Sequence, residues 1–434
     1  MRSIATFGMR HLRRHFDSLA SIGIRIAAVG FGFLVTIAVG RSLGAEAVGQ
    51  YGIITQTGMF LSILCVGGLD LSVIRSFSEA RAGNDRPATA SFLTVSALLV
   101  GLMALVGAGL LLSRDLLDEQ LLSAANSTVA LAVIVAILFA RGFTRFTSSF
   151  LRSQGEYIFS QIVEGPLIPA IVILAILAGF ASDLERVLIA TGIAGLFACI
   201  LGFVGSMRNT SGGGRQIALR PLVKRAVPLW GVAVSKNLSD WYSLAVVAAL
   251  LSLYDAGVFR VAMQVASALP IITIGIFSVY SPKFGVAHAR EDYAEIAKLA
   301  RTATVLSTVL VVPAALLGVI LARPLLSVFG AEFVGGAFVL QVLLVGQTLY
   351  VCTGPSGLVL AMTGNERVNL LLTVISLVAL LVALPVAADQ FGLMGVVVAM
   401  SVVLVVRNVV SLVAVRRLTG VAILSGRYIA PPAR

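Results

Sequence analysis

The chain has 434 residues, of which 58% are hydrophobic and 12% charged, and its formal net charge is +12. A soluble globular domain carries about 25% charged residues, so this composition excludes an ordinary soluble protein and favours repeated membrane-spanning helices. The apolar runs do not alternate with polar residues, which argues against a transmembrane β-barrel.

Taken in chain order, twelve apolar runs predict an all-α, polytopic membrane protein. The expected spans are 18–39, 51–73, 88–112, 128–150, 158–179, 186–207, 228–252, 258–280, 302–321, 338–361, 368–387 and 392–415. The loops between them alternate between basic and nearly charge-free, and basic loops stay on the cytoplasmic side. We therefore expect both termini in the cytoplasm. The positive charge reports this topology and does not indicate nucleic-acid binding.

A basic, glycine-rich stretch at 208–225 divides the spans into two sets of six and predicts a flexible cytoplasmic linker. We expect an N-terminal lobe at 1–207, a C-terminal lobe at 226–420 and a cytoplasmic tail at 421–434. Short turn motifs recur at an offset of 208 or 209, namely Gly49 and Tyr51 with Gly257 and Phe259, and Leu151 and Gly155 with Leu360 and Gly364. These repeats predict two parallel halves with a substrate path between them.

Ionisable residues inside spans are costly and are therefore candidates for function. The cations are Arg25, Arg141, Arg145, Lys236 and Arg407, and the anions are Asp70, Glu164 and Asp240. Long basic side chains near a helix end can instead snorkel to the headgroups, and this alternative stays open for Arg25, Lys236 and Arg407.

Position and spacing favour a cavity-lining role for some of these cations. Position 28, the equivalent of Lys236 at an offset of 208, lies one turn from Arg25. Arg141 lies near the middle of its span, with Arg145 one turn further on the same face. Two alternatives remain structural: Lys236 can pair with Asp240, and Asp70 with Arg75.

Helix breaks are expected at Gly165-Pro166, directly after Glu164, and at Gly354-Pro355. Proline frees backbone carbonyls in a membrane helix, and such breaks often line cavities. Residues 291–301 have the spacing of a short amphipathic helix, which lies either at the inner membrane interface or as a solvated loop. No nucleotide-binding loop or metal-ligand spacing is present, so we expect no cofactor, no metal and no use of ATP by this chain.

With these features the chain resembles the polysaccharide (O-antigen type) flippases, which are distant relatives of the multidrug and toxic-compound extruders. The resembling residues are Leu43-Gly44 and Gly49-Gln50-Tyr51-Gly52, then Leu151-Arg152-Ser153-Gln154-Gly155, then Asp255-Ala256-Gly257-Val258-Phe259, and Pro282. The resemblance covers about 10–420. It implies a bacterial inner-membrane protein that moves a polyprenyl-diphosphate-linked oligosaccharide from the inner to the outer leaflet by alternating access.

The charge pattern fits this substrate, because a cavity with more cations than anions suits a diphosphate. We expect Arg25, Arg141, Arg145 and Lys236 to hold the headgroup, and Asp240, Glu164 or Asp70 to serve any ion coupling. An ion-coupled drug antiporter is the alternative, with Asp240 or Glu164 as its carboxylate. A glycan polymerase would need a large outer loop, so we expect no enzyme activity. Expected partners are the lipid-linked oligosaccharide, the bilayer and other polysaccharide-assembly proteins.

Overall fold

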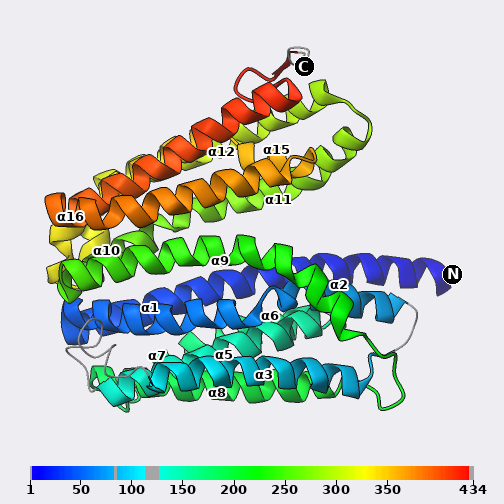
Figure 1. Cartoon of the computed structure of the whole chain (residues 1–434), viewed down its shortest axis with the longest axis horizontal. Helices are drawn as coiled ribbons and strands as arrows, with labels where there is room; N and C mark the ends of the chain where they lie inside the picture. The colour runs from blue at the N-terminus through cyan, green and yellow to red at the C-terminus, as the bar shows by residue number, and fades with distance from the viewer. Residues whose placement is uncertain (1, 83–85, 113–126, 430–434) are drawn as a thin grey trace. The chain divides into compact units, whose positions relative to one another are not determined.

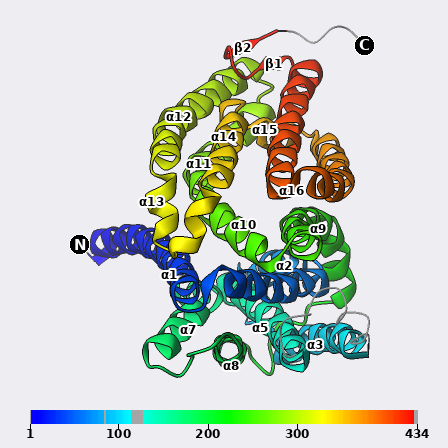
Figure 2. The same ribbon diagram turned by 90° about the vertical axis from the view of Figure 1, so that its left-hand side faces the viewer.

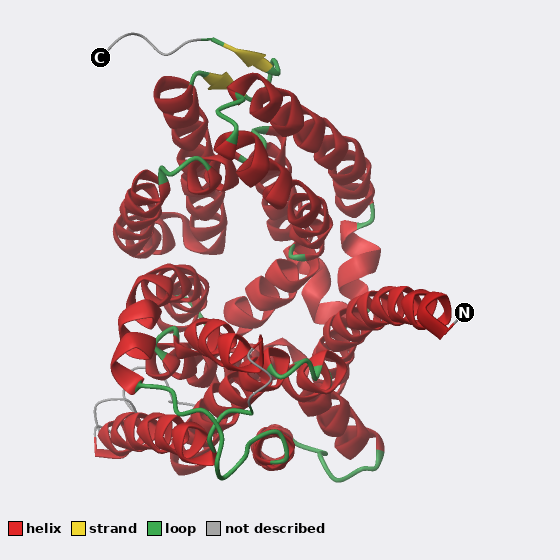
Figure 3. Ribbon diagram, turned by 90° about the vertical axis from the view of Figure 1, so that its right-hand side faces the viewer, coloured by secondary structure: helices red, strands yellow, loops and turns green. Residues whose placement is uncertain are grey.

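The computed structural model describes residues 2–82, 86–112 and 127–429. Helices make up nearly all of this part of the chain (Figure 3). The strands in the described residues are β1 (Val421–Ala422) and β2 (Arg427–Tyr428), which pair as a short antiparallel hairpin. The predicted all-α fold is therefore confirmed.

The chain folds as two compact units. The N-unit consists of Met1–Leu43 and Gln50–Trp241, and the C-unit of Gly44–Gly49 and Tyr242–Arg434. The helices that begin in the N-unit are α1 (Arg2–Val66), α2 (Leu69–Ala82), α3 (Thr89–Leu112), α5 (Ser127–Ser153), α6 (Tyr157–Glu164), α7 (Leu167–Leu177), α8 (Leu184–Met207) and α9 (Leu219–Leu250).

The division between the units falls inside α9, whereas the sequence placed it at the linker before that helix. Hydrogen bonds to the N-unit explain the difference. The Ser72 hydroxyl donates to the Leu222 carbonyl at 2.7 Å, and the Trp241 indole N–H donates to the Thr57 hydroxyl at 2.9 Å. Trp241 also stacks on Phe60 with ring centroids 5.1 Å apart. The first part of α9 thus packs with the N-terminal helices.

Helix α5 is the central packing element of the N-unit and contacts α2, α3 and α8 (Figure 1). Its Phe146 and Phe150 are fully buried against Phe77 of α2 and Phe92 of α3. The Phe92 and Phe150 ring centroids lie 4.7 Å apart, a distance at which aromatic pairs attract beyond their burial. This aromatic cluster fixes the position of α5 and of the side chains on its other faces.

The C-unit continues with α10 (Leu253–Ala266), α11 (Ala268–Ala289), α12 (Tyr293–Ile320), α13 (Ala322–Ser327), the 3₁₀ helix η1 (Ala331–Gly336), α14 (Ala337–Cys352), α15 (Ser356–Met362) and α16 (Glu366–Thr419). Helix α14 packs between α12 and α16 (Figure 2). A second apolar core joins residues of α11, α12, α15 and α16 to Val421 and Ile423 of the terminal segment.

Eight helices in the described part of the chain are long and apolar enough to cross a membrane. The number is nine if α6 and α7, which are bent by 49° at Gly165-Pro166, form one span. Two of the eight, Gly23–Val66 and Glu366–Thr419, are interrupted by left-handed glycines, Gly44 (φ 86°) and Gly392 (φ 61°). Each of these two helices holds most of two predicted spans, because glycine adopts positive φ without a Cβ clash and lets the chain turn.

The repeated turn motifs adopt matching backbone geometry. Gly155 (φ 80°) and Gly364 (φ 75°) are both left-handed helix ends. In each turn the following N–H donates to a carbonyl five positions earlier, from Glu156 to Leu151 at 3.0 Å and from Asn365 to Leu360 at 2.9 Å. This six-residue hydrogen bond is the Schellman ending of a helix. The local repeat is therefore real, and the superposition of whole lobes stays a prediction.

The other repeated pair, Gly49 and Gly257, lies within the C-unit with the two backbones in close contact. A Cβ on Gly49 would meet the Leu253 carbonyl, and a Cβ on Gly257 would meet the Ala45 carbonyl. Both positions therefore need glycine for close approach. The segment Gly44–Gly49 is further held by its Ala45 N–H, which donates to the Glu332 carboxylate at 2.8 Å.

Two further segments differ from expectation. The stretch 208–225 is anchored and partly helical: Ser211 and Arg215 exchange backbone hydrogen bonds with residues 86–89, and α9 begins at Leu219. The amphipathic segment 291–301 is not a separate interfacial helix. Its helix begins at Tyr293 and continues into the α12 span, and Ile296 and Ala300 are buried in the protein core. Helical spacing alone did not indicate which surface the apolar face would meet.

Candidate functional site

Three arginines share one face of α5. Arg141, Arg145 and Arg152 are spaced i, i+4 and i+11, and eleven residues are close to three whole helical turns. At 1.5 Å per residue they extend over roughly 17 Å of the helix. We call these three residues the arginine face. The three positive charges repel one another unless hydrogen-bond acceptors lie against them.

The middle arginine is paired with Asp70 of α2. Arg145 Nε donates to Asp70 Oδ2 at 2.6 Å, and the Asp70 side chain is only 7% exposed. The alternative pairing of Asp70 with Arg75 is not formed, because Arg75 instead faces Glu79 at 3.5 Å on the surface of the same helix. Asp70 lies on the side of α2 that packs against α5, and this places it within reach of Arg145.

The outer two arginines both reach Glu164, at the break between α6 and α7. Arg152 forms an ion pair with the Glu164 carboxylate. Arg141 Nη1 donates to the Glu164 backbone carbonyl at 3.3 Å. The break at Gly165-Pro166 thus presents a carbonyl to a side chain, as the sequence predicted for a proline in a membrane helix.

A cavity of about 310 Å³ opens beside this ion pair, within the N-unit. It is lined by Ile24, Arg25 and Ala28 of α1, Arg152 of α5, and Gln161, Glu164 and Gly165 of the α6 end. Arg25 is exposed, and its charge is close enough to interact with Arg152. Two buried polar atoms of the lining, Arg152 Nε and Gln161 Oε1, have no hydrogen-bond partner among the described residues. The cavity can therefore accept a polar, anionic group.

The structure connects five of the seven predicted site residues through hydrogen bonds or the cavity lining, and the other two lie on α9. Arg25 and Glu164 line the cavity, and Arg141, Arg145 and Asp70 connect to it through the arginine face. Lys236 and Asp240 lie on α9, where both are exposed and their charges interact with each other. Their place in the site stays a prediction.

Sequence reasoning did not single out Arg152 or Gln161 as site residues. In the sequence Arg152 belongs to the turn motif after the fourth span, and its spacing of eleven from Arg141 is the signal that connects it with the site. In the C-unit, Arg407 donates to the Thr373 hydroxyl at 2.8 Å, across the two arms of α16. Among the described residues, no cluster of three or more His, Cys, Asp or Glu side chains has metal-binding geometry.

Comparison with known proteins adds three findings. A family described as "Polysaccharide biosynthesis protein" matches residues 17–288. Among solved structures, an inward-facing multidrug resistance MATE family transporter of the MOP superfamily aligns with a TM-score of 0.70 at 14% identity, covering 94% of this chain and 97% of its own. The lipid II flippase MurJ, in an inward closed conformation, aligns with a TM-score of 0.64 at 12% identity, covering 92% and 87%. No curated protein sequence matches the chain.

Proposed function

Because the chain belongs to the polysaccharide biosynthesis protein family, we propose that it is a flippase for a polyprenyl-diphosphate-linked oligosaccharide. The substrate moves from the inner to the outer leaflet by alternating access. The chain is a multi-pass membrane protein whose fold is that of multi-helix transporters.

The observation that carries the proposal is the excess of positive charge around the N-unit cavity. Arg25, Arg141, Arg145 and Arg152 are gathered there with only two carboxylates among the described residues, Asp70 and Glu164. Charge buried at membrane depth is costly unless a partner compensates it. An anionic ligand supplies that compensation, and phosphate oxygens accept charge-assisted hydrogen bonds from guanidinium groups.

The headgroup of such a substrate is too polar to cross hydrocarbon unaided, because unpaired charge there costs many kcal/mol. The cavity replaces part of its hydration with arginine donors, while the polyprenyl tail stays in the bilayer. Arg25 and Arg152 make the first contacts, and Arg145 and Arg141 lie successively further along α5. Lys236 completes the proposed cation set from α9. Arg141, Arg145 and Arg152 each exchange an acceptor in the protein for a phosphate oxygen and later recover it, which keeps binding reversible.

An ion-coupled drug antiporter is the second candidate, and one observation favours it. A further solved structure with this fold is the MATE multidrug transporter DinF-BH, determined as a complex, with a TM-score of 0.62 at 18% identity and coverage of 94% of this chain and 96% of its own. An extruder of cations needs an available carboxylate in the membrane. Here Glu164 is held by Arg152, and the surplus of arginines around it repels cationic drugs, so Asp240 on α9 is the carboxylate that this candidate would use.

We also propose a location and partners for the protein. We place the protein in the bacterial cytoplasmic (inner) membrane with both termini in the cytoplasm, from the distribution of basic loops. It acts with other polysaccharide-assembly proteins, binds no nucleic acid and catalyses no covalent step.

The test uses surface-glycan export in a strain that depends on this protein. Arg141→Ala should abolish export while the protein still reaches the membrane, because the half-buried guanidinium contributes a donor that water cannot replace. Arg141→Lys should retain part of the activity, since the charge remains and the planar donor set is lost.

The matched control is Arg186→Ala. Arg186 is in the same unit, is 60% exposed and pairs with Asp183 at 3.3 Å on the surface. Its replacement should leave export unchanged. Normal export by Arg141→Ala, or equal loss in the two variants, would contradict the assignment of the arginine face to the substrate.

A further inference from the structure

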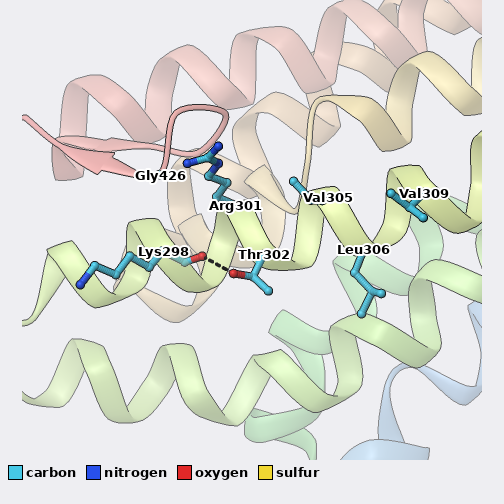
Figure 4. Close-up of a pocket in the computed structure, with 7 residues that line it drawn as sticks. All are labelled: Lys298, Arg301, Thr302, Val305, Leu306, Val309 and Gly426. Carbon is cyan, nitrogen blue, oxygen red and sulfur yellow. Dashed lines mark hydrogen bonds between the residues drawn. The ribbon is translucent and has the colours of Figure 1, made fainter.

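A second cavity, of about 590 Å³, lies in the C-unit against exposed side chains of α12. It is lined by Lys298, Arg301, Thr302, Val305, Leu306, Val309 and Gly426 (Figure 4). All of these residues except Gly426 come from about three turns of α12, and Gly426 comes from the turn of the terminal hairpin. We call this cavity the hairpin groove. The proposed transport site uses none of its residues.

The chemistry of the hairpin groove changes along α12. Lys298 and Arg301 lie at one end, and Val305, Leu306 and Val309 continue from there into the apolar part of the helix (Figure 4). All five side chains are exposed. The distance from Arg301 to Val309 along the axis is about 12 Å at 1.5 Å per residue. A charged end followed by an apolar stripe of this length matches a lipid headgroup with the first part of its acyl chain.

The two cations of the groove have no carboxylate partner within the described part of the chain. Among the described residues, neither Lys298 nor Arg301 forms an ion pair, although Glu295 lies only three positions before Lys298. The only polar contact of Arg301 is a hydrogen bond from Nη1 to the Ser425 carbonyl at 3.4 Å, within the part of the chain that the structure describes. The groove lining therefore carries two positive charges and no negative one.

The terminal hairpin makes this surface concave and fixes Arg301. Val421 and Ile423 are buried in the C-unit core, and Tyr428 stacks on Tyr293 with centroids 5.9 Å apart. Gly426 has φ 67°, and a Cβ there would meet the Arg301 side chain. Two basic residues at a helix end can snorkel to the headgroups without any contact to a hairpin. The contact between the hairpin and Arg301 therefore indicates a formed binding site.

Helix α12 is long and apolar enough to cross a membrane, and bilayer lipid must cover its exposed apolar face. We propose that the hairpin groove binds one anionic phospholipid of the cytoplasmic leaflet. Its phosphate lies between Lys298 and Arg301, and an acyl chain lies along Val305, Leu306 and Val309. Anionic leaflets attract such basic residues, and two of them are enough for selection over zwitterionic lipid.

The experiment measures lipid retention by native mass spectrometry after purification of the full chain from bilayers of phosphatidylglycerol and phosphatidylcholine. The protein should keep one phosphatidylglycerol, and Lys298→Ala/Arg301→Ala should weaken its retention roughly ten- to thirtyfold. Gly426→Ala keeps both charges but displaces Arg301, and it should also lower retention. The control Arg220→Ala/Lys224→Ala removes two exposed charges from α9 and should have no effect.

Other outcomes overturn the proposal. Equal losses in the groove and control variants would mean general surface attraction, and unchanged retention in Gly426→Ala would mean snorkelling without a formed site. Competition by soluble glycerol 3-phosphate would indicate a free phosphate site. Preference for a polyprenyl phosphate over phosphatidylglycerol would make the groove part of the transport path. Thermal stability of each variant in detergent alone separates loss of lipid from loss of folding.

Discussion

At the scale of single residues, the N-unit site is defined by the acceptors of its arginines. Asp70 holds Arg145, and the Glu164 carboxylate and carbonyl hold Arg152 and Arg141. Arg25 is exposed on the cavity wall and forms no ion pair with the described residues. The cluster therefore keeps one cation available while the others are oriented by protein groups. A preoriented donor loses less conformational freedom when a ligand arrives.

The Asp70–Arg145 pair gives a prediction about stability. Asp70→Ala should destabilise the N-unit by about 2–4 kcal/mol, because it leaves a partly buried guanidinium without its acceptor. Removing both partners should cost less than the sum of the single changes. The coupling energy should be about 1–2 kcal/mol, reduced by the 31% exposure of Arg145. Unfolding by SDS in mixed micelles measures the free energy of unfolding of the unchanged protein, the two single variants and the double variant.

The matched control for this cycle is the Arg75–Glu79 pair on the same α2. Its side chains are 75% and 53% exposed, so its coupling energy should stay below about 0.5 kcal/mol. If the two cycles give the same coupling energy, Asp70 does not hold Arg145 in the folded protein.

At the scale of secondary-structure elements, both units use a broken helix, and different groups satisfy the freed backbone. In the N-unit, Arg141 of the proposed site donates a hydrogen bond to the Glu164 carbonyl at the break. In the C-unit, Asn408 of α16 forms hydrogen bonds with the residues around the break at Gly354-Pro355. Its amide donates to the Tyr350 carbonyl at 2.9 Å and to the Thr353 hydroxyl, and its oxygen accepts from Ser356 at 2.7 Å. The second break is therefore a packed, neutral joint.

This joint predicts a large effect of Asn408→Ala. The change leaves several buried polar groups unpaired, each worth about 1–3 kcal/mol, so the C-unit should lose about 2–4 kcal/mol of stability. Asn237→Ala is the control, because the Asn237 amide bonds only to the Ala233 carbonyl of its own helix among the described residues. Thermal unfolding with a reporter in each unit measures the effect. A loss equal to that of the control variant would show that Asn408 does not support the break.

At the scale of the whole molecule, transport by alternating access requires an energy source, and carboxylates are the candidates for ion coupling. Asp70 and Glu164 are engaged by arginines, and Asp240 lies one turn from Lys236 on α9, where the two charges interact. We expect Asp240→Asn to reduce gradient-dependent transport most, because Lys236 can exchange between substrate and carboxylate. Flux is measured with and without an imposed proton or sodium gradient. If Asp240→Asn, Asp70→Asn and Glu164→Gln all keep full gradient dependence, none of the three carboxylates serves the coupling.

Local patterns in the sequence are enough to predict the class of the protein and much of its local structure. Apolar runs of membrane length predicted the helices, because hydrogen bonding within the segment is obligatory in lipid. Gly155 and Gly364 recur at one offset because both helix ends need positive φ. Arg25, Arg141, Arg145 and Glu164 stood out because charge is rare and costly inside a span. These signals are local and do not depend on which helices meet.

The identity of each residue's partner, in contrast, depends on how the helices pack. The Asp70–Arg145 pair joins positions 75 apart, and the hydrogen bonds of Trp241 and Ser72 place the start of α9 with the N-unit. The segment 291–301 has the periodicity of an interfacial helix, yet its apolar side packs against Val359 and Val421 of its own chain. Periodicity fixes which residues share a face, whereas the surface that meets the face depends on packing between segments distant in sequence. Pairings of charge, like the covering of apolar faces, are therefore settled only when the helices assemble.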